Sequence, residues 1–186
     1  LGFLFVIPGC AGAFRTDVFK SQVRFEHDTV TEDLDFTFRL HRTGHKILYN
    51  RKAISYTQDP TTVSAYINQM RRWSSGGWQN LVKHYQIAKR PRNALELSLM
   101  FLDGLTFSTL LFLLPLININ FFKYFLGPYL FFQAGVAVYA AVTRRRWDLI
   151  FYSPFYILLT FINAYVFLEQ FIKEVVFRKR SLVSFQ

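Results

Sequence analysis

Three long apolar runs in the second half of the chain constrain its fold more than any other feature. They cover residues 94–117, 121–142 and 149–171. Each exceeds the roughly 20 residues that a helix needs, at about 1.5 Å per residue, to cross the hydrocarbon core of a bilayer. Helices of a soluble bundle would carry polar stripes at helical spacing, and these runs carry few. Residues 94–186 are therefore predicted to form a transmembrane region with about three helices.

The chain carries 22 Lys and Arg against 12 Asp and Glu. Its basic clusters at residues 89–92, 144–146 and 178–180 each adjoin an apolar run, which favours a role in membrane orientation over nucleic-acid binding. The first two clusters predict a multi-pass protein of the cytoplasmic membrane whose first half is cytosolic, while the third leaves the orientation of the C-terminus open. The single cysteine, Cys10, permits no internal disulfide and suits a reducing compartment. We expect no nucleic-acid partner.

Extended and helical signals alternate in the first half of the chain. Residues 2–7 are predicted to form a buried strand that ends at the turn "PGCAG", and residues 46–58 are predicted to be extended. Between them, Thr29 and Glu32 match the T-x-x-E pattern of a capping box, which predicts a helix to about residue 42. Gly44 is expected to stop this helix.

A second helix is predicted from Thr61, with apolar residues at helical spacing as far as Trp73. Gly76 and Gly77 are expected to interrupt it. Residues 76–93 then place aromatic and aliphatic side chains on one side and end in a basic cluster. An amphipathic helix of this composition just before a spanning run is typical of the membrane interface. We therefore predict an interfacial helix over residues 76–93.

Gln69, Arg72 and Trp73 lie at positions i, i+3 and i+4 of this second helix and therefore share one sector of it. An amide, a guanidinium and an indole on one surface suit the recognition of a sugar and a phosphate. Trp stacks on the apolar face of a pyranose, and Arg pairs with phosphate oxygens through its planar fork. The structural alternative is that Trp73 fills a core and Arg72 is a solvated charge.

Three acidic residues, Glu32, Asp33 and Asp35, gather at the start of the first predicted helix. Asp33 lies in the first turn, where the partial positive charge of the helix N-terminus favours an ionised carboxylate. Such a carboxylate can serve as a general base. The alternative is that all three acids merely complement the helix dipole.

The stretches "GCAGAFR" (9–15), "TEDLDFTFRLHRTGHKILY" (31–49) and "QMRRW" (69–73) occur in this order before the apolar runs. In these motifs the chain resembles the membrane-bound, inverting glycosyltransferases of family 2, which include cellulose, hyaluronan, chitin and poly-N-acetylglucosamine synthases. The resemblance implies an α/β fold in which residues 1–75 form the C-terminal half of a GT-A-like catalytic domain. It also implies that the chain is the C-terminal piece of a longer enzyme.

The resemblance implies a role for each motif. Asp33 of the TED motif would be the catalytic base. Glu32, Gln69, Arg72 and Trp73 would bind substrate, and Gly9 and Gly12 would let the backbone approach the acceptor closely. The enzyme would transfer a sugar from a UDP-sugar donor to a growing β-linked polysaccharide. The alternatives are a transferase that glycosylates a membrane lipid and a non-catalytic transport or scaffold subunit.

The resemblance also implies a divalent cation, Mg²⁺ or Mn²⁺, whose ligands are expected in the preceding half of the catalytic domain. No metal ligands are predicted within this chain, because His27, His41, His45 and His84 are scattered without converging spacing. With half of its donor site elsewhere, the chain alone is expected to be inactive.

Overall fold

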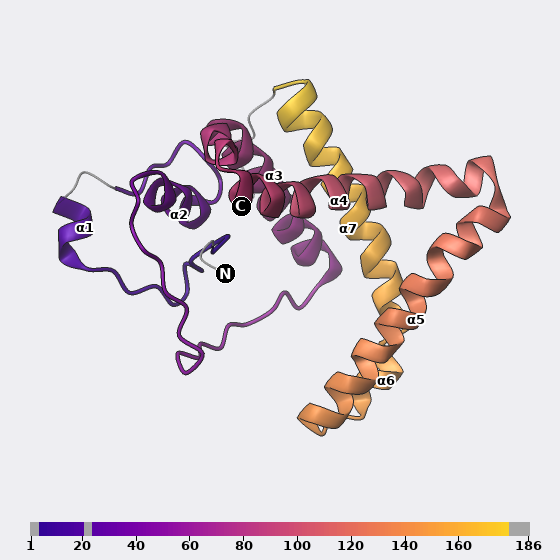
Figure 1. Ribbon diagram of the computed structural model, residues 1–186. Helices are drawn as coiled ribbons and strands as arrows, with labels where there is room; N and C mark the ends of the chain where they lie inside the picture. The colour runs from indigo at the N-terminus through magenta and orange to yellow at the C-terminus, as the bar shows by residue number, and fades with distance from the viewer. Residues whose placement is uncertain (1–3, 21–23, 179–186) are drawn as a thin grey trace. The chain divides into compact units, whose positions relative to one another are not determined.

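The computed structural model describes residues 4–20 and 24–178 and divides the chain into two compact units (Figure 1). Unit 1 comprises residues 1–101 and 169–186, and unit 2 comprises residues 102–168. The helices of the first half of the chain are α1 (Thr16–Lys20), α2 (Glu32–Arg42), α3 (Val63–Lys83) and the short 3₁₀ helix η1 (Tyr85–Lys89). They are followed by α4 (Pro91–Ile117), α5 (Ile119–Arg144), α6 (Asp148–Tyr152), α7 (Phe155–Phe171) and the π-helix η2 (Ile172–Val176).

The predicted α/β fold is wrong, since the described residues contain helices and extended chain but no strand. The backbone of residues 4–7 bonds to side chains of α2 instead of a neighbouring strand. Thr37 Oγ1 accepts from the Ile7 amide at 2.9 Å, and His41 Nε2 donates to the Leu4 carbonyl at 2.8 Å. An extended segment becomes a strand only when another segment pairs with its backbone groups, and here α2 satisfies them.

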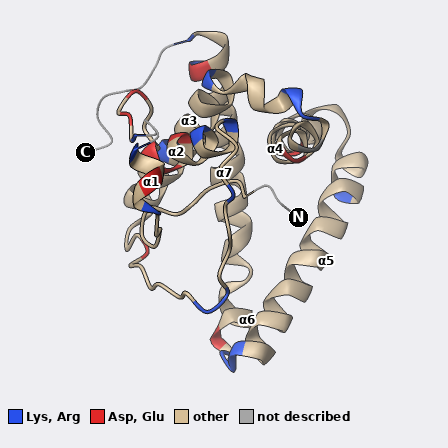
Figure 2. Cartoon of the chain, turned by 60° about the vertical axis from the view of Figure 1, so that its left-hand side comes forward, with Lys and Arg blue, Asp and Glu red and all other residues tan. Residues whose placement is uncertain are grey.

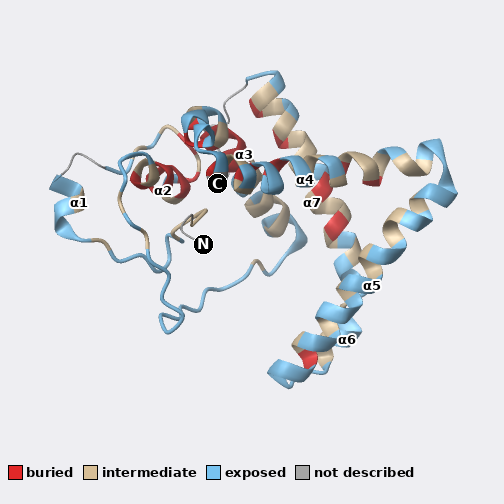
Figure 3. Cartoon of the chain, viewed as in Figure 1, coloured by how far each residue is buried: buried red, intermediate tan, exposed pale blue. Residues whose placement is uncertain are grey.

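Helix α2 forms the core of unit 1. Its buried residues lie on more than one face, and Phe36 stacks on Phe25 with ring centroids 4.2 Å apart. Figure 3 shows buried residues gathered on α2 and on the second half of α3. The predicted capping box at Thr29 is wrong, because Thr31 occupies the N-cap and makes no side-chain capping bond. The predicted C-terminal end is confirmed, and Gly44 adopts the positive φ of 78° that follows many helices.

Helix α3 continues without a break through Gly76 and Gly77, so the predicted interruption there is wrong. Both glycines are buried, and at Gly76 the missing side chain makes room for Thr31. Packing against α2 therefore overrides the low helix propensity of the two glycines. The segment 76–93, predicted as a separate interfacial helix, begins inside α3 and runs through η1 into α4. Its location in a membrane interface remains a prediction.

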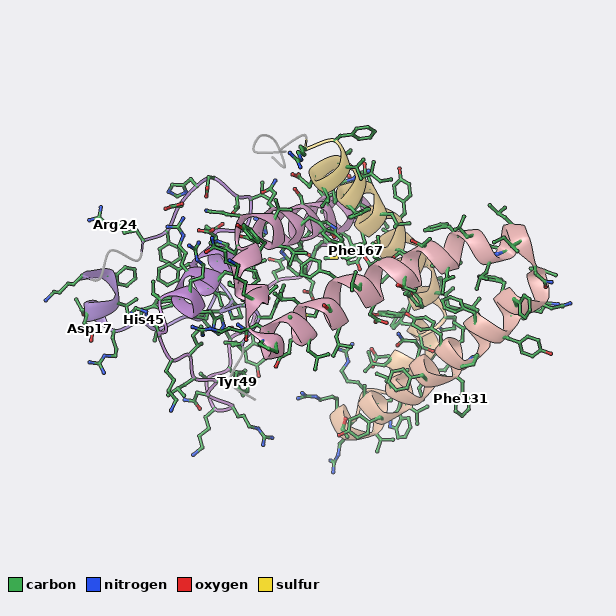
Figure 4. All side chains as sticks on the ribbon, turned by 45° about the horizontal axis from the view of Figure 1, so that its top comes forward. Asp17, Arg24, His45, Tyr49, Phe131 and Phe167 are labelled. Atoms are coloured by element: carbon green, nitrogen blue, oxygen red, sulfur yellow. The ribbon has the colours of Figure 1, made fainter. Side chains whose placement is uncertain are left out.

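The prediction of three apolar helices is confirmed. The segments Asn93–Ile117, Ile119–Arg144 and Phe155–Val176 are long and apolar enough to cross a membrane. Charged residues are sparse along α5 and α7 in Figure 2, and Phe131 of α5, labelled in Figure 4, is 84% exposed. The third predicted run divides into α6 and α7, and α7 begins directly after Pro154. Within unit 2, the hydroxyl groups of Tyr129 on α5 and Thr160 on α7 form a hydrogen bond of 3.1 Å.

Candidate functional site

Asp33 and the glycine-rich turn, 24 residues apart in the sequence, meet in the structure. The amide of Gly9 donates to Asp33 Oδ2 at 3.2 Å, and the amide of Leu34 donates to Oδ1 at 2.8 Å. Each carboxylate oxygen therefore accepts a backbone hydrogen bond and keeps a further lone pair. Asp33 is only half-buried, so part of its side chain is open to solvent.

The two glycines of this turn have different surroundings. A Cβ atom added to Gly9 would lie 3.6 Å from Asp33 Oδ2, so the turn passes directly over the carboxylate. A Cβ atom at Gly12 would lie 3.0 Å from the ring of Phe14 and 3.1 Å from Ile7. The structure thus places Gly9 beside the candidate base and Gly12 against the side chains of Phe14 and Ile7. Glu32, the acid before Asp33, is exposed.

Gln69 and Arg72 line an open cavity of about 490 Å³ on the first half of α3. The other residues around it come from the same helix and from the segment before it: Gln58, Asp59, Pro60, Thr61, Ala65 and Asn68. Trp73 does not line this cavity, and it is 52% exposed. This exposure excludes the alternative that Trp73 fills the core of unit 1.

Helix α3 brings the Q-x-x-R-W motif close to the start of α2, which lies beside it in both Figure 1 and Figure 2. Thr31 packs on Gly76, and the side-chain amide of Asn80 donates to Thr31 Oγ1 at 3.1 Å. Arg72 precedes Gly76 by one turn, or about 6 Å of helix. In the described part of the chain, no hydrogen bond or ion pair joins Asp33 directly to Gln69, Arg72 or Trp73. The structure brings the two motifs into one region without a direct contact.

Asp35 is fully buried, so it belongs to the salt-bridged side of α2 and not to a solvated one. It accepts from His84 Nε2 at 2.7 Å, from Lys83 Nζ at 2.7 Å and from Arg39 Nε at 2.9 Å. Burial acts to raise the pKa of Asp35, but the hydrogen bonds and charges of His84 and Lys83 outweigh it and hold the pKa below its ordinary value. Asp35 therefore anchors α2 to the end of α3. Sequence reasoning missed His84 because nothing in its local pattern links it to a residue 49 positions away.

Comparison with known families identifies the chain. The family described as "Glycosyl transferase family group 2" matches residues 1–168, which is most of the sequence. The chain belongs to this family.

Several curated glycosyltransferases are similar to part of the chain. An uncharacterized glycosyltransferase of Escherichia coli (strain K12), YaiP, is 36% identical over 75 residues, which are 40% of this chain and 19% of YaiP. A poly-beta-1,6-N-acetyl-D-glucosamine synthase of Staphylococcus epidermidis is 26% identical over 84 residues, which are 45% of this chain and 20% of the synthase. The chain thus spans about a fifth of the length of these relatives. No solved structure matches it.

The divalent cation implied by the family resemblance does not fit the acidic cluster of this chain. Glu26, Asp28 and Asp35 place carboxylate oxygens within 4.8 Å of one another, the one such group in residues 4–20 and 24–178. Lys83 Nζ lies among them, at 3.2 Å, 2.6 Å and 2.7 Å respectively. Arg39 also pairs with Glu26 and Asp35. Each of the three carboxylates already pairs with Lys83, and two of them also pair with Arg39, so this cluster is an ion-pair network and not a metal site.

Proposed function

We propose that the protein containing this chain transfers a sugar from a UDP-sugar donor, with inversion at the anomeric carbon, to a growing β-linked polysaccharide. The observation that carries the proposal is the bond from the Gly9 amide to Asp33 at the start of α2, beside the helix that holds Gln69 and Arg72. Similarity to a poly-beta-1,6-N-acetyl-D-glucosamine synthase supports a polymeric product.

In this proposal Asp33 is the catalytic base. Its carboxylate takes the proton from the acceptor hydroxyl as the acceptor oxygen attacks the anomeric carbon from the face opposite UDP. The bond between the anomeric carbon and the phosphate oxygen breaks, and UDP leaves with the electron pair. A single displacement of this kind inverts the configuration and needs one base. The backbone bonds to Asp33 fix its carboxylate while leaving a lone pair on each oxygen for the acceptor.

The motif on α3 binds the reacting groups. Arg72 is exposed at the cavity edge, and its guanidinium pairs with diphosphate oxygens and stabilises the charge that develops on departing UDP. Gln69 donates to and accepts from sugar hydroxyls in the same cavity. Trp73 offers an exposed indole face on which a pyranose can stack. Gly9 keeps the turn over Asp33 thin enough for the acceptor to approach.

The reaction is proposed to occur at the cytoplasmic face of the membrane. The basic residues that adjoin the apolar helices, among them Lys89, Arg90 and Arg144, support a cytosolic location for the first half of the chain. The Mg²⁺ or Mn²⁺ that would neutralise the diphosphate is assigned to residues outside this chain. Because the chain spans about a fifth of its curated relatives, we expect activity from the full-length protein and none from this chain alone.

The configuration of the product tests inversion. The full-length protein in membranes is incubated with UDP-N-acetylglucosamine, whose sugar is α-linked, and the new linkage is read by proton NMR. Inversion predicts a β-linkage in the first product formed. An α-linkage would contradict the proposal.

A second candidate function is the glycosylation of a membrane lipid. The observation that favours it is a cavity of about 470 Å³ in unit 2, lined mainly by apolar residues of α5, α6 and α7 and able to take an acyl chain. Sizing of the product from labelled UDP-sugar separates the two candidates, since a polymer gives a long ladder and a lipid acceptor gives one short product.

A further inference from the structure

We propose that Gln79 and Glu174 are positioning residues for the catalytic base, linking η2 at the end of α7 to the turn that carries the TED motif. The inference rests on the proposed role of Asp33. It assigns a function to two buried polar side chains outside the motifs, both within unit 1.

Glu174 lies in η2 and is 6% exposed. Its Oε1 accepts from Ser75 Oγ at 2.6 Å and from Gln79 Nε2 at 3.0 Å, both on α3. Ser75 and Gln79 are themselves buried and bond to each other at 3.2 Å. A buried carboxylate is costly unless hydrogen bonds compensate it, and these two donors come from the helix that carries the Q-x-x-R-W motif.

Glu174 determines which way the Gln79 amide faces. Gln79 Oε1 accepts from the backbone amide of Val30 at 3.1 Å, while its Nε2 donates to Glu174. If the amide were turned over, its NH₂ group would face the Val30 N–H and its oxygen would face a carboxylate, so both bonds would be lost. The acceptor on η2 therefore holds the amide oxygen toward residue 30.

Val30, whose amide bonds to Gln79, lies just before the candidate base in the chain. Val30 lies three residues before Asp33, and the carbonyl of Thr31 accepts the first helical bond of α2, from the Asp35 amide at 3.1 Å. Asn80, the residue after Gln79, bonds to Thr31 Oγ1. Two neighbouring amides of α3 thus fix residues 30 and 31, and this fixes the first turn of α2. Loss of one of them lets Asp33 shift relative to Gly9 and to the substrate.

Steady-state transfer from UDP-sugar by the full-length protein in membranes tests this link, with kcat and KM compared between variants. Gln79→Met and Glu174→Leu keep the side-chain volume but remove the bonds. A misplacement of about 1 Å can cost on the order of 100-fold in rate, so both variants are expected to lower kcat by roughly 10- to 100-fold. The KM for UDP-sugar should change less than about twofold, because the donor contacts are untouched.

Two further variants separate positioning from simple packing. Glu174→Gln keeps an oxygen that accepts from Ser75 and Gln79, so it should restore most of the activity that Glu174→Leu loses. Glu169→Gln is the matched control, because it weakens the ion pair to Arg71, which joins α3 to the last turn of α7, just before η2, without touching residue 30. It should leave kcat unchanged. If positioning passes through one chain of bonds, the double variant Gln79→Met with Glu174→Leu should lose no more than the worse single variant.

Wild-type kcat in Gln79→Met, or an equal loss in Glu169→Gln, would overturn the inference. If Glu174→Leu does not accumulate in the membrane, Gln79→Met decides the question alone. Asp33→Asn is measured in the same membranes. Full activity of Asp33→Asn would refute the proposed base, whereas an inactive Asp33→Asn beside a fully active Gln79→Met would refute only the positioning link.

Discussion

Gly76→Ala should push Thr31, the first residue of the TED motif, away from α3. An added Cβ atom would lie 2.1 Å from Thr31 Oγ1, 2.5 Å from its Cγ2 and 2.8 Å from its Cβ. Side chains essentially never approach closer than 3.0 Å in this way, so Thr31 or α3 must move by at least about 0.9 Å. Thr31 cannot simply rotate aside, because it is buried and bonded to Asn80.

Two opposing terms set the size of the effect. Alanine is favoured over glycine in a helix interior by about 1 kcal/mol. Overpacking a closely packed contact costs about 1–3 kcal/mol, and the overlap with three atoms of Thr31 places Gly76→Ala toward the upper end. We therefore expect net destabilisation of about 1–2 kcal/mol. A displacement of about 0.9 Å near Asp33 should also lower the transfer rate on the order of 10- to 100-fold.

Gly77→Ala is the matched control on the same helix. Its Cβ atom would lie 3.5 Å from the ring of Phe101, an ordinary contact, so the helix-propensity gain should dominate and stability should rise slightly. Thermal unfolding of the full-length protein in detergent, followed by circular dichroism, compares the two variants, and transfer assays in membranes measure the rates. If Gly76→Ala is as stable and as active as Gly77→Ala, Thr31 does not pack on Gly76 as described.

Two further predictions concern the buried ion pairs of α2. Asp35→Asn should destabilise unit 1 by roughly 3 kcal/mol, because it leaves Arg39 and Lys83 without a fully buried counter-charge, and chemical denaturation should show a lower midpoint. The pKa of Asp35 is lowered in the folded state, so its stabilising contribution is present above its unfolded pKa of about 3.9 and is lost as pH falls through the folded value. Wild-type stability should therefore drop below about pH 4 more steeply than that of Asp35→Asn, and equal slopes would contradict the buried bonds described for Asp35.

Some of the structure follows from local sequence. The apolar helices were predictable because their length and composition are properties of single continuous segments. The end of α2 was predictable because a glycine in the left-handed region acts on the residues beside it. The absence of a strand at residues 4–7 was not predictable, because the amide of Ile7 bonds to a side chain 30 residues away, which the local sequence does not indicate.

The candidate site likewise has features that local sequence predicts and features that depend on contacts between distant segments. The helical spacing of Gln69 and Arg72 predicted that they share a surface, and both line one cavity. The contact of Gly9 with Asp33 and the buried link from Glu174 to Val30 join segments far apart in the chain, so only the folded structure reveals them. The predicted break of α3 at its two glycines was wrong, because the packing of Gly76 on Thr31 outweighs the low helix propensity of glycine.

The role of Asp33 is tested most directly by the transfer rate of Asp33→Asn in the full-length protein. Glu32→Gln is the comparison, at the exposed neighbouring acid that the family resemblance assigns to substrate binding and not to proton transfer. Asparagine preserves the shape of Asp33 but cannot take a proton, so kcat should fall by about 10²- to 10⁴-fold, while Glu32→Gln should retain far more activity than that. A rate for Asp33→Asn close to that of the wild type would show that another group is the base.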